Sequence, residues 1–280
     1  MLYNVDEMSL SIYKHVRKPF VYVVIVAFVL AILGGALLLA RQVYSPQTHS
    51  VVIQKKTASK PLATLKAVIK TTPTVKPDYT LPPIQDGLAP VLTTIPTKQP
   101  VVFLGIDDGG FKDPSELQVM KDNNIKATLF LSNAFISDNP DFFKQFVTAG
   151  QALIEDHTLH HYIDLPSRSL AVQEAEICGE ADYMQQEYGR RPVLFRPPGG
   201  SYNTTTQRAA ATCGMKAVIN WIAKANGGAM QYQIGSVLRP GDIVLMHFRP
   251  VFLQDMQAFI VAEKAAGLHT ELLEDWLDPH

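Results

Sequence analysis

Cysteine and net positive charge are both scarce in this chain of 280 residues. Its two cysteines, Cys178 and Cys213, are too few for a zinc site built mainly from thiolates. Residues 99–280 hold 14 Lys and Arg against 22 Asp and Glu, a net charge of −8. Because phosphate binding needs clustered Lys and Arg, this acidic part argues against nucleic acid as the main partner. No segment indicates a protein partner.

Charged residues are missing altogether from Pro19–Ala40, an apolar run of about 22 residues. Such a run is long enough to span the roughly 30 Å hydrocarbon core of a bilayer. A buried helix and a cleaved signal peptide are the alternatives, but a signal peptide has an apolar core of about 7–15 residues and a small-residue cleavage site. We therefore expect an uncleaved transmembrane anchor over residues 19–40.

The basic cluster at the end of residues 1–18 predicts the orientation of this anchor. Lys14, Arg17 and Lys18 precede the apolar run. Basic residues stay on the cytoplasmic side of a membrane span, so residues 1–18 form a cytoplasmic tail. The expected location is the plasma membrane, with a single span and with everything after Arg41 outside the cell.

Residues 41–97 lack Trp, Cys and any lasting amphipathic period. They are rich in Thr, Pro, Lys, Ser and Gln, which predicts an extended or disordered linker. Its lysines could rest on anionic lipid or wall polymer, but we favour the simpler view that they keep the segment soluble.

From residue 98 to residue 280 the pattern changes to apolar runs that alternate with helix-length segments. Such alternation predicts an α/β domain of parallel strands with crossover helices. An irregular βα barrel and a doubly wound sheet both fit the pattern. In both folds active sites form at the carboxyl ends of the strands.

Polar side chains follow several of these predicted strands. Asp107 and Asp108 end the run VVFLGIDDGG, where a solvated turn or a helix cap is the alternative to an active site. His157 and His161 follow the next-but-one strand, and histidines four apart can face one way on a helical turn and bind one metal ion. The alternative is two surface histidines, but with one aspartate they would supply the ligands of a catalytic zinc ion.

Two further groups occupy equivalent places. Arg196 begins the sequence RPPGG, a fixed turn with exposed backbone N–H groups, and it can pair with a carboxylate and keep it ionised. His247 ends the apolar run DIVLMH. A surface arginine and a structural histidine are the alternatives at these two positions.

The four motifs, in this order, resemble those of the polysaccharide deacetylases, the NodB-homology family or carbohydrate esterase family 4. GIDDGG resembles the family's TFDDG, HTLHH its H-[ST]-x-x-H, RPPGG its RPPYG, and LMH its L-x-H. The resemblance covers about residues 98–280 and implies a distorted (β/α)7 barrel. It implies an enzyme that hydrolyses acetyl groups from chitin-like polymers, peptidoglycan or xylan.

The resemblance also implies roles for single residues and one divalent metal ion, zinc first and cobalt or nickel as alternatives. Gly199 would offer a backbone N–H to the oxyanion. The other roles are metal ligands Asp108, His157 and His161, general base Asp107 held by Arg196, general acid His247, acetyl-pocket residue Leu245 and cleft wall Trp221.

The chain departs from the family at two places. Gly199 replaces the usual Tyr of RPPYG, which puts the substrate in doubt. The carboxylate that tunes the acid histidine is missing after Trp221, where Asn226 is the nearest polar residue. We expect this loss to lower the pKa of His247 and to give a slower enzyme or a shifted pH optimum.

The sequence thus predicts a membrane-anchored, metal-dependent deacetylase of a surface polysaccharide, with peptidoglycan as the first choice. A wall-organising protein with a weakened site and an O-acetyl esterase are the alternatives. Outside the cell Cys178 and Cys213 could form a disulfide, or they could be two buried thiols.

Overall fold

The structure, a computed structural model, describes residues 76–277. The predicted cytoplasmic tail, the predicted anchor at residues 19–40 and most of the predicted linker lie outside these residues. Among residues 76–277 no helix is both long and apolar enough to cross a membrane.

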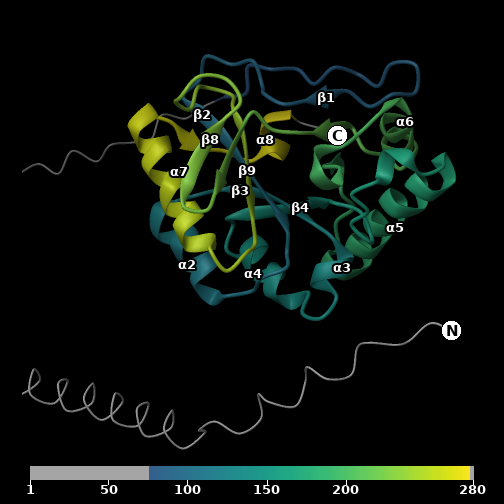
Figure 1. Cartoon of the computed structure of the whole chain (residues 1–280), viewed down its shortest axis with the longest axis horizontal. Coiled ribbons are helices and arrows are strands. Elements are labelled where there is room, and N and C mark those ends of the chain that lie inside the picture. The colour runs from purple at the N-terminus through teal and green to yellow at the C-terminus, as the bar shows by residue number, and fades with distance from the viewer. Residues whose placement is uncertain (1–75, 278–280) are drawn as a thin grey trace, which may run out of the picture. The chain divides into compact units, whose positions relative to one another are not determined.

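A curved, mainly parallel sheet forms the centre of the domain (Figure 1). Its strands follow the order β1-β6-β5-β4-β3-β2-β9-β7-β8, with β10 paired to β2. All pairs are parallel except the hairpin β7–β8. The bounds are β1 Val91–Leu92, β2 Val101–Asp108, β3 Ala127–Leu131, β4 Ala152–Asp156, β5 Leu194–Phe195, β6 Ala217–Ile219, β7 Ala223–Asn226, β8 Ala229–Tyr232, β9 Ile243–His247 and β10 His269–Thr270.

This sheet is an α/β half-barrel. Within residues 76–277 no strand pairing joins β1 to β8, and the segment after β1 meets the start of β9 through a bridge between Thr94 and Asp242. The predicted distorted (β/α)7 barrel is confirmed as a mainly parallel α/β half-barrel. The hairpin β7–β8 adds an antiparallel edge beyond β9, and β1 contributes two residues at the other edge.

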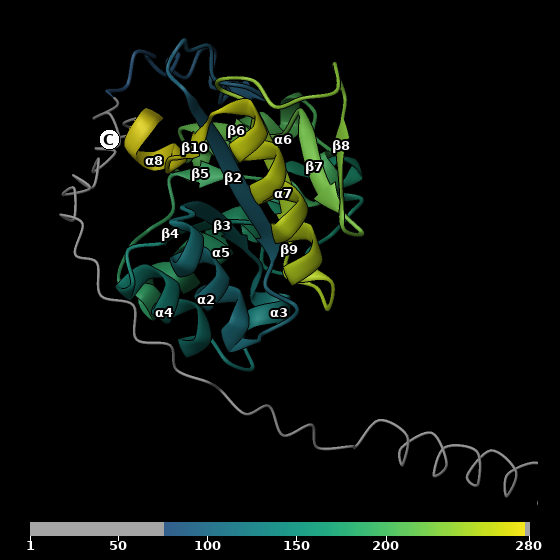
Figure 2. The same cartoon turned by 90° about the vertical axis from the view of Figure 1, so that its left-hand side faces the viewer.

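Helices cover the outer face of the sheet (Figure 2). Asp113 caps the first of them by accepting from the backbone N–H of Ser115, and Glu116 accepts from the N–H of Asp113, which completes a capping box. The helices are α2 Pro114–Asn123, α3 Asn133–Ile136, α4 Asp141–Thr148, α5 Leu170–Tyr188, α6 Thr204–Thr212, α7 Phe252–Ala266 and α8 Leu273–Leu277, and the 3-10 turns are Leu165–Ser167 and Pro198–Gly200.

Alternation along β2 divides its side chains between two cores. Leu104 and Ile106 pack in the larger core with residues of α2, α4 and α7, whereas Phe103 faces the inner side of the half-barrel and packs against Trp276 of α8. Because successive side chains point to opposite faces, Asp107 lies on the same inner face as Phe103. The short α8 thus fills the inner side below the site.

Two features differ from the sequence prediction. The predicted linker was to end at residue 97, but Ala89, Leu92 and Ile95 are buried and β1 pairs with β6. These apolar side chains bind the segment to the sheet, so the domain begins before residue 98. The hairpin β7–β8 was also not predicted. Its turn, Gly227–Gly228, has two positive φ angles, which glycine adopts without strain.

Candidate active site

Asp107 and Asp108 end β2 at the carboxyl edge of the sheet. Asp107 is in register with Phe130 of β3 on one side and with His247 of β9 on the other. Asp108 has a positive φ of 75°, which turns the chain at the end of the strand. The two neighbouring carboxylates therefore occupy different environments and can take different roles.

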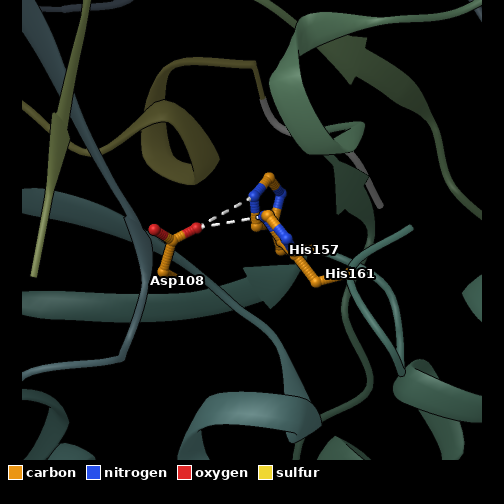
Figure 3. Close-up of side chains that lie close together, drawn as sticks. All are labelled: Asp108, His157 and His161. Atoms are coloured by element: carbon orange, nitrogen blue, oxygen red, sulfur yellow. Dashed lines mark ion pairs between the residues drawn. The ribbon is translucent and has the colours of Figure 1, made fainter. Parts of the chain in front are cut away.

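Asp108, His157 and His161 converge on one point (Figure 3). The Oδ1 atom of Asp108 lies 3.5 Å from Nε2 of His157 and 3.2 Å from Nε2 of His161. One ligand atom from each residue lies within 4.8 Å of the other two. Two imidazoles and one carboxylate fit a divalent metal ion with open positions for water and substrate.

A strained loop after β4, rather than a helical turn, brings the two histidines together. Thr158 and His161 have positive φ angles of 70° and 56°, so the predicted helical turn was wrong. The N–H of Thr158 donates to Oδ1 of Asp156 at 2.9 Å, and the N–H of His161 donates to Oγ1 of Thr158 at 3.1 Å. These bonds hold a conformation that β-branched residues rarely adopt.

The tautomer of His157 suits metal binding. Its Nδ1 lies 2.6 Å from the carbonyl oxygen of Arg196, an atom that can only accept. Nδ1 therefore carries the proton and Nε2 offers its lone pair toward Asp108. Burial by itself would raise the pKa of the Asp108 carboxyl, but when the histidines are protonated their hydrogen bonds, from His157 and His161, and their charges lower it well below its usual range.

Arg196 is fully buried on the inner face and pairs with Asp107. Its Nη1 lies 2.6 Å from Oδ1 of Asp107, and its guanidinium stacks 4.1 Å from the centre of the Phe130 ring. Burial lowers the pKa of Arg196 and the Asp107 charge opposes this, but an arginine remains protonated. The pairing fixes the Asp107 carboxyl group against a buried positive charge, in a position suited to a general base.

His247 faces the same site from β9, in register with Asp107. Burial lowers its pKa, and the charges of Arg249 and His157 lower it further, while Asp107 and Asp108 act in the opposite direction. The pKa of His247 is lowered, as predicted, but the largest cause is burial of the side chain and not the missing carboxylate. Asn226 does not replace the missing carboxylate, because its Oδ1 accepts from Nη1 of Arg249 at 3.4 Å.

The remaining predicted residues also lie around this edge. Gly199 has a positive φ of 63°, and among residues 76–277 its N–H has no acceptor, as an oxyanion donor requires. The Trp221 ring lies against Gly200, with its centre 5.8 Å from the Arg196 guanidinium carbon. Leu245 is buried and shares its face of β9 with His247, because the alternate residues Val244 and Met246 belong to the outer core.

Comparison with known proteins agrees with this geometry. The family model of polysaccharide deacetylase matches residues 94–218. An uncharacterised protein of Streptomyces coelicolor is 39% identical over 169 residues, which cover 58% of this chain and 67% of that protein. The chain belongs to the polysaccharide deacetylase family.

Other members resemble this deacetylase more distantly. A peptidoglycan-N-acetylglucosamine deacetylase of Bacillus cereus is 26% identical over 162 residues, 55% of this chain and 75% of that protein. The chitin deacetylase structure from the fungus Colletotrichum lindemuthianum shares the fold, with a TM-score of 0.58 at 22% identity, over 70% of this chain and 92% of that one. This family membership identifies the chain as a polysaccharide deacetylase, a hydrolase.

The two cysteines of the deacetylase form a disulfide that joins α5 to the end of α6. Residues 178 and 213 are 35 positions apart, so the bridge closes a loop that contains β5 and the Arg196 turn. The sequence left open a disulfide or two buried thiols, and the structure contains the disulfide.

Two functional residues of the deacetylase were missed. A Cβ atom at Gly105 would lie 2.3 Å from Nη1 of Arg196, so only glycine leaves room for the guanidinium. An isolated glycine inside an apolar strand was the available signal, since it often marks such a close approach. Asp156, which holds Thr158, had no signal beyond its place before His157.

Proposed function

We propose that this protein is a metal-dependent hydrolase that removes N-acetyl groups from a cell-surface polysaccharide. The observation that carries the proposal is the buried pair of Asp107 and Arg196 beside the convergent ligands Asp108, His157 and His161. A binding protein has no need for a carboxyl group held by a buried arginine next to a metal site.

The metal would be held by Asp108, His157 and His161. A divalent ion there supplies Lewis acidity toward the acetyl carbonyl and lowers the pKa of water. Zinc suits two histidines and one carboxylate, and cobalt or nickel are the alternatives.

The chain's own residues supply the rest of the reaction. Asp107 accepts a proton from the attacking water, while Arg196 holds its carboxylate in place. The N–H of Gly199 donates to the oxygen on which negative charge develops, and Leu245 contacts the acetyl methyl group. His247 gives a proton to the departing sugar amine, so that acetate leaves and the free amine remains.

Peptidoglycan or another polymer of N-acetylglucosamine is the proposed substrate. The apolar run at residues 19–40 and the basic cluster before it support a single-pass plasma membrane protein with its catalytic domain outside the cell. An anchored domain acts on polymers close to the membrane. The disulfide between Cys178 and Cys213 is typical of an extracytoplasmic protein.

O-acetyl ester hydrolysis is the second candidate. The lowered pKa of His247 favours it, because an alkoxide leaves with less help from a general acid than an amine does.

Acetate release by the full chain, purified in detergent, tests these proposals. The substrates are N-acetylglucosamine oligomers, peptidoglycan and O-acetylated xylan, each with zinc, with chelator and with the Asp107→Asn variant. We expect release from the N-acetylated substrates that needs both metal and Asp107. Release from the ester alone would replace the first proposal by the second, and no release from any substrate with one metal bound per chain would contradict both.

A further inference from the structure

Two cationic side chains beside the site, Lys224 and Arg249, have no part in the mechanism. Lys224 lies in the middle of β7. Its neighbours Ala223 and Ala225 are buried in the outer core, so Lys224 and Asn226 point to the opposite, inner face of the sheet.

This inner face is the one that carries His247. Lys224 is in register with Leu245 of β9, which precedes His247 by two residues. In-register residues on neighbouring parallel strands point to the same side and lie about 4.8 Å apart. The Lys224 side chain therefore starts next to the residue assigned to the acetyl pocket (Figure 2 shows β7 beside β9).

Arg249 reaches the same face from the loop after β9. Its Nη1 lies 3.4 Å from Oδ1 of Asn226, which places the guanidinium over the end of β7. A cavity of about 200 Å³ adjoins Lys224 and is lined by Trp221, Ala223, Lys224, Gln231, Tyr232 and Gln233.

Neither cation has an anionic partner among residues 76–277, which is also true of Lys121, Arg208 and Lys216 but not of several other cations. Lys112 pairs with Asp138, and Lys144 pairs with Asp141 and Glu187. In a segment with a net charge of −8, two uncompensated cations on the active-site face favour an anionic ligand.

We propose that Lys224 and Arg249 bind a carboxylate carried by the substrate sugar, close to the acetamido group that is hydrolysed. This inference rests on the proposed deacetylase function and narrows its substrate to an N-acetylated sugar acid within the polymer. Arginine presents a planar fork that matches a carboxylate, and the ammonium of Lys224 supplies a second charge.

The test compares two forms of one substrate. Peptidoglycan strands freed of peptide carry a lactyl carboxylate on every second sugar, and methyl esterification removes that charge while the acetamido groups stay. The kcat/KM of the metal-loaded full chain is measured on both forms for wild type, the double variant Lys224→Gln with Arg249→Gln, and the control Lys216→Gln. Lys216 precedes β6 at the amino end of the sheet, away from the site.

We expect wild type to prefer the carboxylate form by about tenfold or more, since a charge-assisted contact contributes about 1.5–3 kcal/mol. The double variant loses this preference, whereas Lys216→Gln keeps it. High salt weakens the preference of wild type. Equal losses on both forms, or a wild type that hydrolyses both forms equally, would overturn the inference.

A binding measurement separates this inference from the proposed function. Calorimetric titration of the metal-loaded Asp107→Asn chain with both strand forms needs no turnover. If no substrate releases acetate, the proposed function fails, yet tighter binding of the carboxylate form that depends on Lys224 and Arg249 still supports the site. Equal binding of both forms contradicts it, and thermal unfolding checks that each variant is folded.

Discussion

The two sides of the candidate site are built differently. Where β2, β4 and β5 end, Asp107, His157 and Arg196 are each at most 2% exposed and are fixed by short polar contacts. Where β7 and β9 end, His247 is half-buried and Arg249 is exposed. Three of the four motifs that match the family lie on the first side, together with the departure at Gly199. The motif LMH and the missing carboxylate lie on the second side. This difference indicates that the buried side holds the base and the metal ligands, whereas the exposed side offers the general acid and groups that can contact the substrate.

The largest expected effects come from removing one histidine from each side of the site, His161 from the buried side and His247 from the exposed side. His161→Ala leaves two metal ligands, so we expect loss of the bound metal and of acetate release below detection. His247→Ala keeps the three ligands, and loss of a general acid lowers kcat by about 10²–10⁴-fold. Metal content after dialysis and kcat are measured for both variants. Full activity of His247→Ala would show that its assignment as the acid is wrong.

A smaller effect on stability and activity is expected when the space beside the Arg196 guanidinium, at Gly105, is filled. Gly105→Ala would place a methyl group against the guanidinium, which is held between Asp107 and Phe130 and cannot move away. Overpacking of this kind costs about 1–3 kcal/mol of unfolding free energy and displaces the base, so kcat falls as well. Urea unfolding and acetate release measure the two effects.

Gly179→Ala is the matched control for this variant. Its Cβ would meet only the Leu159 side chain, at an ordinary distance of 3.5 Å within α5. Alanine inside a helix is more favourable than glycine by about 0.5–1 kcal/mol, so the control gains stability. Similar losses in both variants would argue against a specific contact with Arg196.

The sequence predicted the buried side well because short-range patterns encode it. The segments around residues 114–123, 170–188 and 252–266 show clear helical patterns, and apolar runs end in the side chains that form the site. Because parallel strands align their carboxyl ends, motifs distant in sequence could be expected to meet. That Arg196 can pair with a carboxylate followed from its charge and position, whereas the choice of Asp107 as its partner came from the resemblance to the family.

The exposed side was predicted less well because its structure depends on tertiary context. β7 and β8 contain Lys, Asn and Gln and lack a strong strand pattern, so only the Gly227–Gly228 turn marked the hairpin. Tertiary context also misled the prediction at one place on the buried side: the loop of His157 and His161 was taken for a helical turn, but hydrogen bonds to the side chains of Asp156 and Thr158 decide its shape. No local pattern could show that α8 fills the inner side of the half-barrel.

The buried side also contains a carboxyl group without a partner, and its removal should have the smallest effect. Glu180 of α5 is fully buried, and neither of its carboxyl oxygens has a hydrogen-bond partner in the described structure. Burial, with the nearby charges of Asp156 and Glu176, raises its pKa to about 9. Asp107, by contrast, is buried with a partner. The burial of the Glu180 carboxyl group without a hydrogen-bond partner therefore lowers the free energy of unfolding of the domain.

The variant Glu180→Gln tests this destabilisation, because its effect on the free energy of unfolding should depend on pH. Below about pH 4.5 the carboxyl is protonated in both the folded and the unfolded chain and has no effect on stability. Between that pH and about 9 the unfolded chain ionises first, so wild type loses stability as pH rises. Glutamine does not titrate, so its advantage grows with pH, by up to about 1.4 kcal/mol for each pH unit in this range.

Urea unfolding at pH 5, 6.5 and 8 measures this advantage, with Glu174→Gln on the same helix as the control. Glu174 is half-buried and forms no ion pair within residues 76–277, so its variant reports what the exchange of a carboxyl group for an amide does outside a fully buried site. A gain that is equal at all three pH values would mean that shape and not charge is responsible. A gain that grows with pH would show that the buried side tolerates charge only where, as at Asp107, a partner is provided.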